Sequence, residues 1–150
     1  MPGIVSRVSD SPRREPPGES SPVRARNRRS YRGGMSTAPT VAVVIPARDD
    51  AQLLARCLAA LAEQTRTPDE IIVVDDGSHD DTARTVRAFD ARIVRLDGDG
   101  IPAASAAGYD ATSTRFICRL DADCVPPPEW IAEMLAVLEA CPEAVAVSGG

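Results

Sequence analysis

From Val41 onward, short apolar runs alternate with stretches in which apolar residues recur at helical spacing. The apolar runs predict five strands, over 41–46, 70–76, 92–96, 115–121 and 144–148. The helical spacing predicts helices over 51–64, 77–89 and 128–141, the second opened by a capping-box pattern at Ser78 and Asp81. A Gly- and Ala-rich segment, 98–111, receives no element. Regular βα alternation predicts an α/β fold with a doubly wound, mostly parallel sheet, which binds ligands at the carboxyl ends of its strands.

Residues 1–40 differ in kind, because they are rich in Pro, Ser, Arg and Gly and have no periodic apolar face. This composition predicts a disordered extension ahead of one domain over 41–150, with Met35 as an alternative start. Residues 1–34 hold eight Arg against three acidic residues, and the rest of the chain holds nine Arg against 19 acidic residues. A basic tail could meet an anionic partner such as nucleic acid or a membrane surface, but a solvated extension with no specific nucleic acid is favoured. An acidic body needs a cation to bind a polyanion.

The composition also excludes some functions. The chain contains no Lys, so mechanisms that need one are unavailable within it. No apolar run approaches the ~20 residues of a membrane span, and the N-terminus lacks the apolar region of a signal peptide. The cysteines form no C-x-x-C pair and are interpreted as buried small apolar residues of a cytoplasmic protein: Cys57, Cys118, Cys124 and Cys141. The chain stops at Gly150 directly after a strand, so we expect a sheet that is incomplete at the C-terminus.

Acidic residues lie at, or directly after, the carboxyl ends of three of the predicted strands. They are Asp49 and Asp50, Asp75 and Asp76, and Asp121 and Asp123. Carboxyl ends of parallel strands share one edge of a sheet, so these carboxylates should converge, and hard oxygen ligands of this kind suit Mg²⁺ or Mn²⁺. The alternative interpretation is that "DDGS" is a strand-to-helix turn and "DAD" a polar loop.

Three segments, "VAVVIPARDD", "EIIVVDDGSHDDT" and "ICRLDADCVPPPEW", in this order and spacing, resemble the glycosyltransferase family 2 enzymes with the GT-A fold. The resemblance covers about residues 41–150 and implies the nucleotide-sugar-binding half of a Rossmann-like GT-A domain. It implies a nucleotide-diphosphate sugar donor of the UDP or GDP type, Mg²⁺ or Mn²⁺ as cofactor, and transfer to an acceptor hydroxyl with inversion.

The resemblance also assigns roles by position. Pro46 and Ala47 match the strand end that walls the nucleotide base, with Asp49 beside them, and Asp75 and Asp76 match the acidic pair that contacts base and ribose. The remaining pair, Asp121 and Asp123, matches the D-x-D motif, whose first Asp meets ribose or metal and whose second ligates the metal.

Two features of the family pattern are missing. No catalytic residue is assigned within this chain, because the carboxylate base, most of the acceptor site and any peripheral membrane association are expected beyond residue 150. Ser105 and Ala106 stand where the family usually has Arg and Asn, and Thr114-Arg115 stands where Gly-Asp is usual. The absent Arg removes a diphosphate contact, which bears on donor affinity and donor identity.

Three alternatives remain. A receiver domain with Asp121 as phosphoacceptor needs a Lys, which the chain lacks, and an Asp-x-Asp phosphatase needs a downstream basic residue that is usually Lys. A non-catalytic nucleotide-sugar-binding fragment is supported as strongly by the sequence as an active enzyme.

Overall fold

The computed structural model describes residues 3–7 and 39–148, which form six strands and four helices. In chain order they are β1 (Ile4–Arg7), β2 (Val41–Ala47), α1 (Ala51–Ala62), β3 (Glu70–Asp76), α2 (Thr82–Ala88), β4 (Arg92–Leu96), α3 (Ile101–Asp110), β5 (Phe116–Arg119), α4 (Trp130–Ala140) and β6 (Ala146–Ser148). All five predicted strands and all three predicted helices are present. The last strand begins two residues later than expected.

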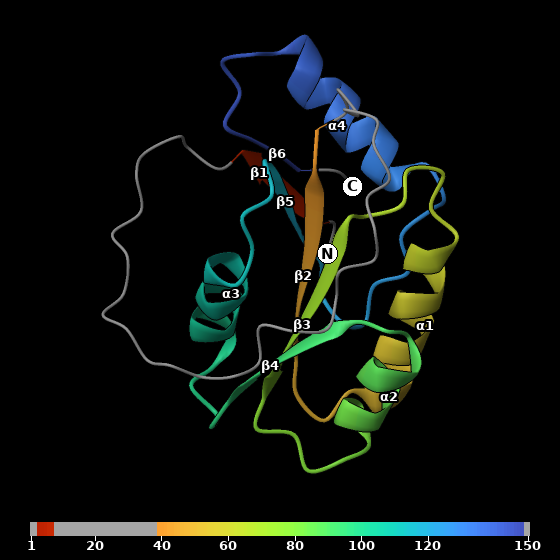
Figure 1. Cartoon of the computed structure of the whole chain (residues 1–150), viewed down its shortest axis with the longest axis vertical. Coiled ribbons are helices and arrows are strands. Elements are labelled where there is room, and N and C mark those ends of the chain that lie inside the picture. Colours follow the sequence, from red (N-terminus) through yellow and green to blue (C-terminus); the bar gives the residue numbers. More distant parts are fainter. Residues whose placement is uncertain (1–2, 8–38, 149–150) are drawn as a thin grey trace, which may run out of the picture.

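The strands form one sheet in the order β4-β3-β2-β5-β1-β6 (Figure 1). The pairs β2–β3, β2–β5 and β3–β4 are parallel, and β1 is antiparallel to both β5 and β6. The predicted α/β class with a mostly parallel sheet is therefore confirmed. The order places the carboxyl ends of β2, β3 and β5 side by side, which is where the acidic motifs fall.

Helices cover both faces of the sheet (Figure 1). Alternate residues of β2 explain this: Val43 and Ile45 belong to the larger apolar cluster with α1 and α4, and Val44 belongs to a second cluster under α3. Both faces are thus apolar, as a strand covered on two sides requires. No helix within the described ranges is long and apolar enough to cross a bilayer.

Strand β1 contradicts the expectation that residues 1–40 are wholly disordered. Residues 4–7 pair with Phe116–Arg119 on one side and 4–6 pair with Ala146–Ser148 on the other. Val5 is fully buried in the larger apolar cluster. A segment more than 100 residues away in sequence from β5 and β6 therefore joins the sheet. Its backbone pairs with both of these strands, which satisfies their N–H and C=O groups, and Val5 packs into the apolar cluster. The rest of the predicted extension, 8–38, lies outside the described residues.

Helix α3 lies in the segment for which the sequence predicted no element. Its apolar face consists of small residues, so its periodic signal is weak, and Pro102 stands in its first turn, where proline is tolerated. A Cβ at Gly108 would lie 2.2 Å from Val44 Cγ1 and 3.1 Å from Val74 Cγ2. Glycine at this position allows the helix backbone to approach β2 and β3 closely.

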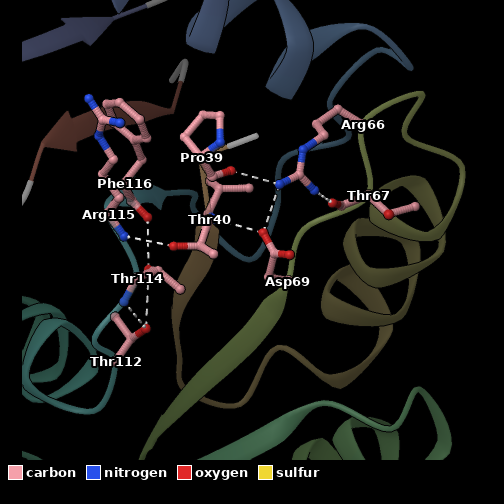
Figure 2. Close-up of polar contacts among 10 residues, drawn as sticks. Pro39, Thr40, Arg66, Thr67, Asp69, Thr112, Thr114, Arg115 and Phe116 are labelled. Carbon is pink, nitrogen blue, oxygen red and sulfur yellow. Dashed lines mark hydrogen bonds and ion pairs between the residues drawn. The ribbon is translucent and has the colours of Figure 1, made fainter. Parts of the chain in front are cut away.

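Figure 2 shows that polar contacts fix the opposite, amino ends of β2 and β5. Asp69 Oδ2 accepts the Val41 N–H at 2.8 Å and pairs with Arg66 at 2.7 Å. The Arg115 N–H donates to Thr40 Oγ1 at 3.0 Å, and Thr114 Oγ1 donates to the Phe116 carbonyl at 2.9 Å. Thr114-Arg115, one of the two departures from the family pattern, therefore belongs to this end of the sheet and not to the acidic rim.

Candidate functional site

The turn after β5 gathers one group of potential metal ligands. Single donor atoms of Asp121, Asp123 and Cys124 all lie within 4.8 Å of one another. The Asp121 carbonyl fixes the turn by accepting the Cys124 N–H at 3.1 Å and the Cys57 thiol of α1 at 3.9 Å. Asp121 and Asp123 thus lie in a turn that is anchored to α1. We call Asp121, Asp123 and Cys124 the donor cluster.

The cysteines differ from the expectation that all four are buried. Cys57 and Cys118 are buried, but Cys124 is half-buried in the donor cluster and Cys141 is exposed. Burial raises the pKa of the Cys57 thiol to about 12, and the nearby Cys124 and Asp123 add to the rise. Burial likewise raises the pKa of Cys118 to about 12. Cys57 therefore stays protonated and donates its S–H to the Asp121 carbonyl. Cys124 belongs to the candidate site, which the sequence analysis did not predict.

The acidic pair at the end of β3 is buried and already bonded to the chain. Asp76 is 4% exposed, and its two oxygens accept the N–H groups of Asp99 and Gly100 at 2.8 and 2.9 Å. Asp75 is 5% exposed and accepts the Ser78 N–H at 2.9 Å. Asp76 therefore shapes the loop that leads into α3, while Asp75 fixes the turn after its own strand.

The end of β2 lies against this pair, since Ala47 is the register partner of Asp75. Pro46 and Ala47 are both buried. Asp49 has a φ of 55°, donates its N–H to Ser78 Oγ at 3.0 Å, and accepts the His79 N–H at 2.7 Å. The loops after β2 and β3 are consequently locked to one another across the rim.

The predicted capping box at the start of α2 is wrong, although the helix itself is present. The cap position is Asp81, and its side chain makes no capping hydrogen bond. Asp80 accepts the Thr82 N–H at 2.9 Å and the Ala51 N–H of α1 at 2.9 Å. Ser78, which was expected to cap α2, instead accepts the Asp49 N–H of another loop. Asp80 accepts N–H groups at the starts of both α1 and α2.

A cation that the sequence analysis did not single out stands beside the donor cluster. Arg119, the last residue of β5, donates from Nη2 to Asp121 Oδ1 at 2.6 Å and from Nε to Ser105 Oγ of α3 at 3.3 Å. The sequence does carry a signal for Arg119. It lies two positions after Ile117, so it falls on the same covered face of the strand, where a charged residue is unusual. Arg95 is a second rim cation, with Nε 3.9 Å from Asp75 Oδ2.

The donor cluster fits a divalent cation. Two carboxylates are the hard ligands that Mg²⁺ and Mn²⁺ prefer, and the exposed Asp123 leaves the cluster open to a ligand of its own. Among the described residues this cluster does not include Asp75 or Asp76, so the carboxylates that were predicted to converge fall into two separate groups.

Comparison with known proteins assigns the chain to a family. Residues 42–149 match the profile described as glycosyl transferase family 2. Glycosyltransferase AglE of Haloferax volcanii is 33% identical over 104 residues, 64% of this chain and 34% of its own. Validoxylamine A glucosyltransferase of Streptomyces hygroscopicus subsp. limoneus is 35% identical over 112 residues, 69% of this chain and 25% of its own. The chain thus spans a quarter to a third of the length of these relatives.

Solved structures agree on the fold. S. aureus TarS matches with a TM-score of 0.62 at 21% identity, over 67% of this chain and 32% of that one. Glucosyl-3-phosphoglycerate synthase from Mycobacterium tuberculosis, solved with Mn²⁺, UDP and glucosyl-3-phosphoglycerate, matches with a TM-score of 0.59 at 26% identity, over 67% of this chain and 39% of that one. Both are GT-A glycosyltransferases, so the predicted fold type is confirmed.

Proposed function

The chain belongs to glycosyl transferase family 2, and on that premise we propose that it binds the nucleotide-diphosphate sugar of a glycosyltransferase through a divalent metal at the donor cluster. The observation that carries the proposal is the grouping of Asp121 and Asp123 in the turn after β5, at the same edge of the sheet as the buried pair that ends β3. The similar mycobacterial synthase, solved with Mn²⁺ and UDP, supports this choice of ligand and metal. A bound metal would act as a Lewis acid on the departing diphosphate.

The other rim residues then receive roles around the nucleoside. We propose that Pro46 and Ala47 form the wall for the base and that Asp49 helps to keep that wall in place through its bonds to Ser78 and His79. Asp75 is the better candidate for contact with base or ribose, because both oxygens of Asp76 accept backbone N–H groups. Asp76 then contributes by ordering the loop before α3.

For the whole protein we propose transfer of the sugar to an acceptor hydroxyl with inversion, using a carboxylate base beyond residue 150. Residues 41–150 form the nucleotide-sugar-binding half in this proposal. The buried thiols of Cys57 and Cys118 form no disulfide with each other, which favours a reducing compartment, so we propose a cytoplasmic site, with any membrane association made by residues beyond 150. GDP remains an alternative to UDP as the donor's nucleotide.

A second candidate is a non-catalytic domain that binds the nucleotide sugar without transferring it. It is favoured by one observation, the short share of the relatives' length that the chain spans. To distinguish the two candidates, the 150-residue protein is incubated with UDP- and GDP-sugars, and the nucleoside diphosphate that is released is measured. Turnover lost in Asp123→Ala would exclude the binding-only candidate.

Binding itself is tested by thermal unfolding with Mn²⁺ and either UDP or GDP. A ligand at 100 times its Kd stabilises the native state by about 2.7 kcal/mol, which raises the Tm by roughly 5–10 °C in a domain of this size. We expect this rise with at least one of the nucleotides, and we expect Asp123→Ala to abolish it. Asp97→Ala is the matched control, because Asp97 is an exposed carboxylate after β4 that lies outside the donor cluster.

The outcomes separate the parts of the proposal. Equal rises in wild type and Asp123→Ala would refute the metal site while leaving nucleotide binding in place. No rise with either nucleotide, in the presence of Mn²⁺, would refute donor binding by this domain.

A further inference from the structure

Arg119 is fixed between α3 and the donor cluster. Along β5, Ile117 packs in the cluster under α3, and Phe116 and Cys118 pack on the opposite face. Alternation therefore places Arg119 on the α3 side, where its Nε contacts Ser105, a residue only 8% exposed. The Arg119 side chain is itself only 24% exposed.

Such a position is costly for a charge unless the charge is paired. Arg119 pairs with Asp121 at 2.6 Å, a charge-assisted hydrogen bond to a member of the donor cluster. Arg95, the other rim cation paired with a carboxylate, is 64% exposed and 3.9 Å from its partner. Solvent screening makes that pair weak, so Arg119 is the cation whose position the fold determines.

We propose that Arg119 binds the diphosphate of the donor, in addition to orienting Asp121. A guanidinium carries five N–H donors in a planar fork, so it can hold a carboxylate and a phosphate oxygen together. The donor atoms of the cluster lie within 4.8 Å of one another, and Arg119 bonds directly to one member. A diphosphate held by a metal at this cluster would therefore be close to the guanidinium. The inference rests on the proposed donor binding.

This assignment explains the unusual residue at position 105. A serine there leaves room for the guanidinium and gives it a hydrogen-bond acceptor. The positive charge absent from α3 is thus supplied by the neighbouring strand, against the same turn of the helix. Donor affinity would then depend on a strand residue two positions before Asp121.

The experiment measures the Kd of UDP and of uridine, each with Mn²⁺, by calorimetry on the full 150-residue protein. Arg119→Met removes the charge but keeps much of the length of the side chain. We expect the Kd of UDP to rise about 10- to 100-fold, the usual effect of losing a hydrogen-bonded charge, and that of uridine to change less than about twofold. Arg119→Lys should recover part of the loss, because Lys supplies a point charge without the fork.

Two further variants sharpen the test. Ser105→Arg combined with Arg119→Met returns the charge to α3 and should bind UDP more tightly than Arg119→Met alone. Arg92→Met is the matched control: Arg92 is also a strand arginine bonded to the end of α3, through the Ala111 carbonyl at 2.6 Å, but at the amino end of β4. We expect its UDP affinity to equal that of wild type.

Each result decides between the inference and its premise. If wild type binds UDP and Arg119→Met binds it equally well, the diphosphate role is wrong and donor binding stands. If Arg119→Met weakens UDP and uridine alike, Arg119 only positions the site, which also overturns the inference. Failure of wild type to bind UDP would remove the premise and the inference together. If Arg119→Met does not fold, Arg119→Lys decides in its place, since wild-type affinity for UDP in that variant would overturn a fork-dependent contact.

Discussion

The two ends of the sheet are stabilised by different means. In the parallel part, β4-β3-β2, the loops at the carboxyl ends bind one another through side chains, as Asp49 with Ser78 and Asp76 with Gly100 show. In the antiparallel part, β5-β1-β6, the inserted strand depends on two backbone ladders, on the burial of Val5 and on the Arg7 guanidinium, which donates to the carbonyls of Leu138 and Pro142. Contacts between loops therefore define the shape of the rim, while contacts of one inserted strand hold the far end together. The donor cluster after β5 lies where the two parts meet.

The largest effect is expected from a charge inside the antiparallel part. Val5→Asp places a carboxylate at a fully buried position in the larger apolar cluster, which should cost on the order of 4 kcal/mol or more. That is a large share of the stability of a small domain. Urea unfolding followed by circular dichroism measures it. Ile4→Asp is the control, because Ile4 is 42% exposed on the same strand and should lose less than about 1 kcal/mol.

Equal losses in Val5→Asp and Ile4→Asp would mean that β1 is not part of the cooperative core. The comparison between the two ends would then fail, because the antiparallel part would be an attached edge and not a stabilising element.

A smaller effect is expected at the rim of the parallel part. Asp76→Ala leaves two backbone N–H groups, those of Asp99 and Gly100, without their buried acceptor, at a cost of about 2–4 kcal/mol. Asp99→Ala keeps both N–H groups and removes only an exposed carboxylate, so its free energy of unfolding should stay within about 0.5 kcal/mol of wild type. If Asp76→Ala were as stable as Asp99→Ala, side-chain bonds would not be what holds the rim.

The packing of α3 on the parallel part gives the third prediction. Gly108→Ala should destabilise by about 1–2 kcal/mol, because the overlap with Val44 Cγ1 exceeds the gain from replacing glycine in a helix. Combining it with Val44→Ala removes the atom that the new Cβ would meet. A double-mutant cycle should then show a favourable coupling of about 1 kcal/mol, and a coupling near zero would contradict the close approach.

The parallel part could be predicted from sequence because its elements are local. The strands around Val43, Val73 and Ile93 carry their own apolar pattern, and Asp75, Asp76 and Asp121 fall at strand ends by chain order alone. Strand β1 could not, because its four residues acquire meaning only against β5 and β6, more than 100 residues away.

Other misses came from choices between partners that local sequence does not decide. Ser78 lies close to the start of α2 but accepts a hydrogen bond from Asp49 across the rim. Asp80 accepts an N–H at the start of α1 as well as one at the start of its own helix. Arg119 reaches the candidate site through its contacts with Ser105 of α3 and with Asp121, and Cys124 reaches it through the turn after β5. A pattern can place a residue at an edge of the sheet, but tertiary packing selects what it contacts there.

The smallest expected effect depends on pH and concerns the same interlocked loops. The hydrogen bond from the Thr82 hydroxyl is the main cause that lowers the pKa of Asp80, with the Ala51 and Thr82 N–H groups adding to it and desolvation opposing. A folded pKa below the ordinary value of 3.8 means that the stabilisation is present above that pH and is lost as the pH falls through the folded pKa. Asp80→Asn should therefore be slightly less stable than wild type at pH 6, and the difference should vanish in strong acid. Asp81→Asn, whose side chain makes no capping bond, should show a flatter difference over the same range, and matching curves for the two variants would remove Asp80 as the carboxylate that joins the starts of α1 and α2.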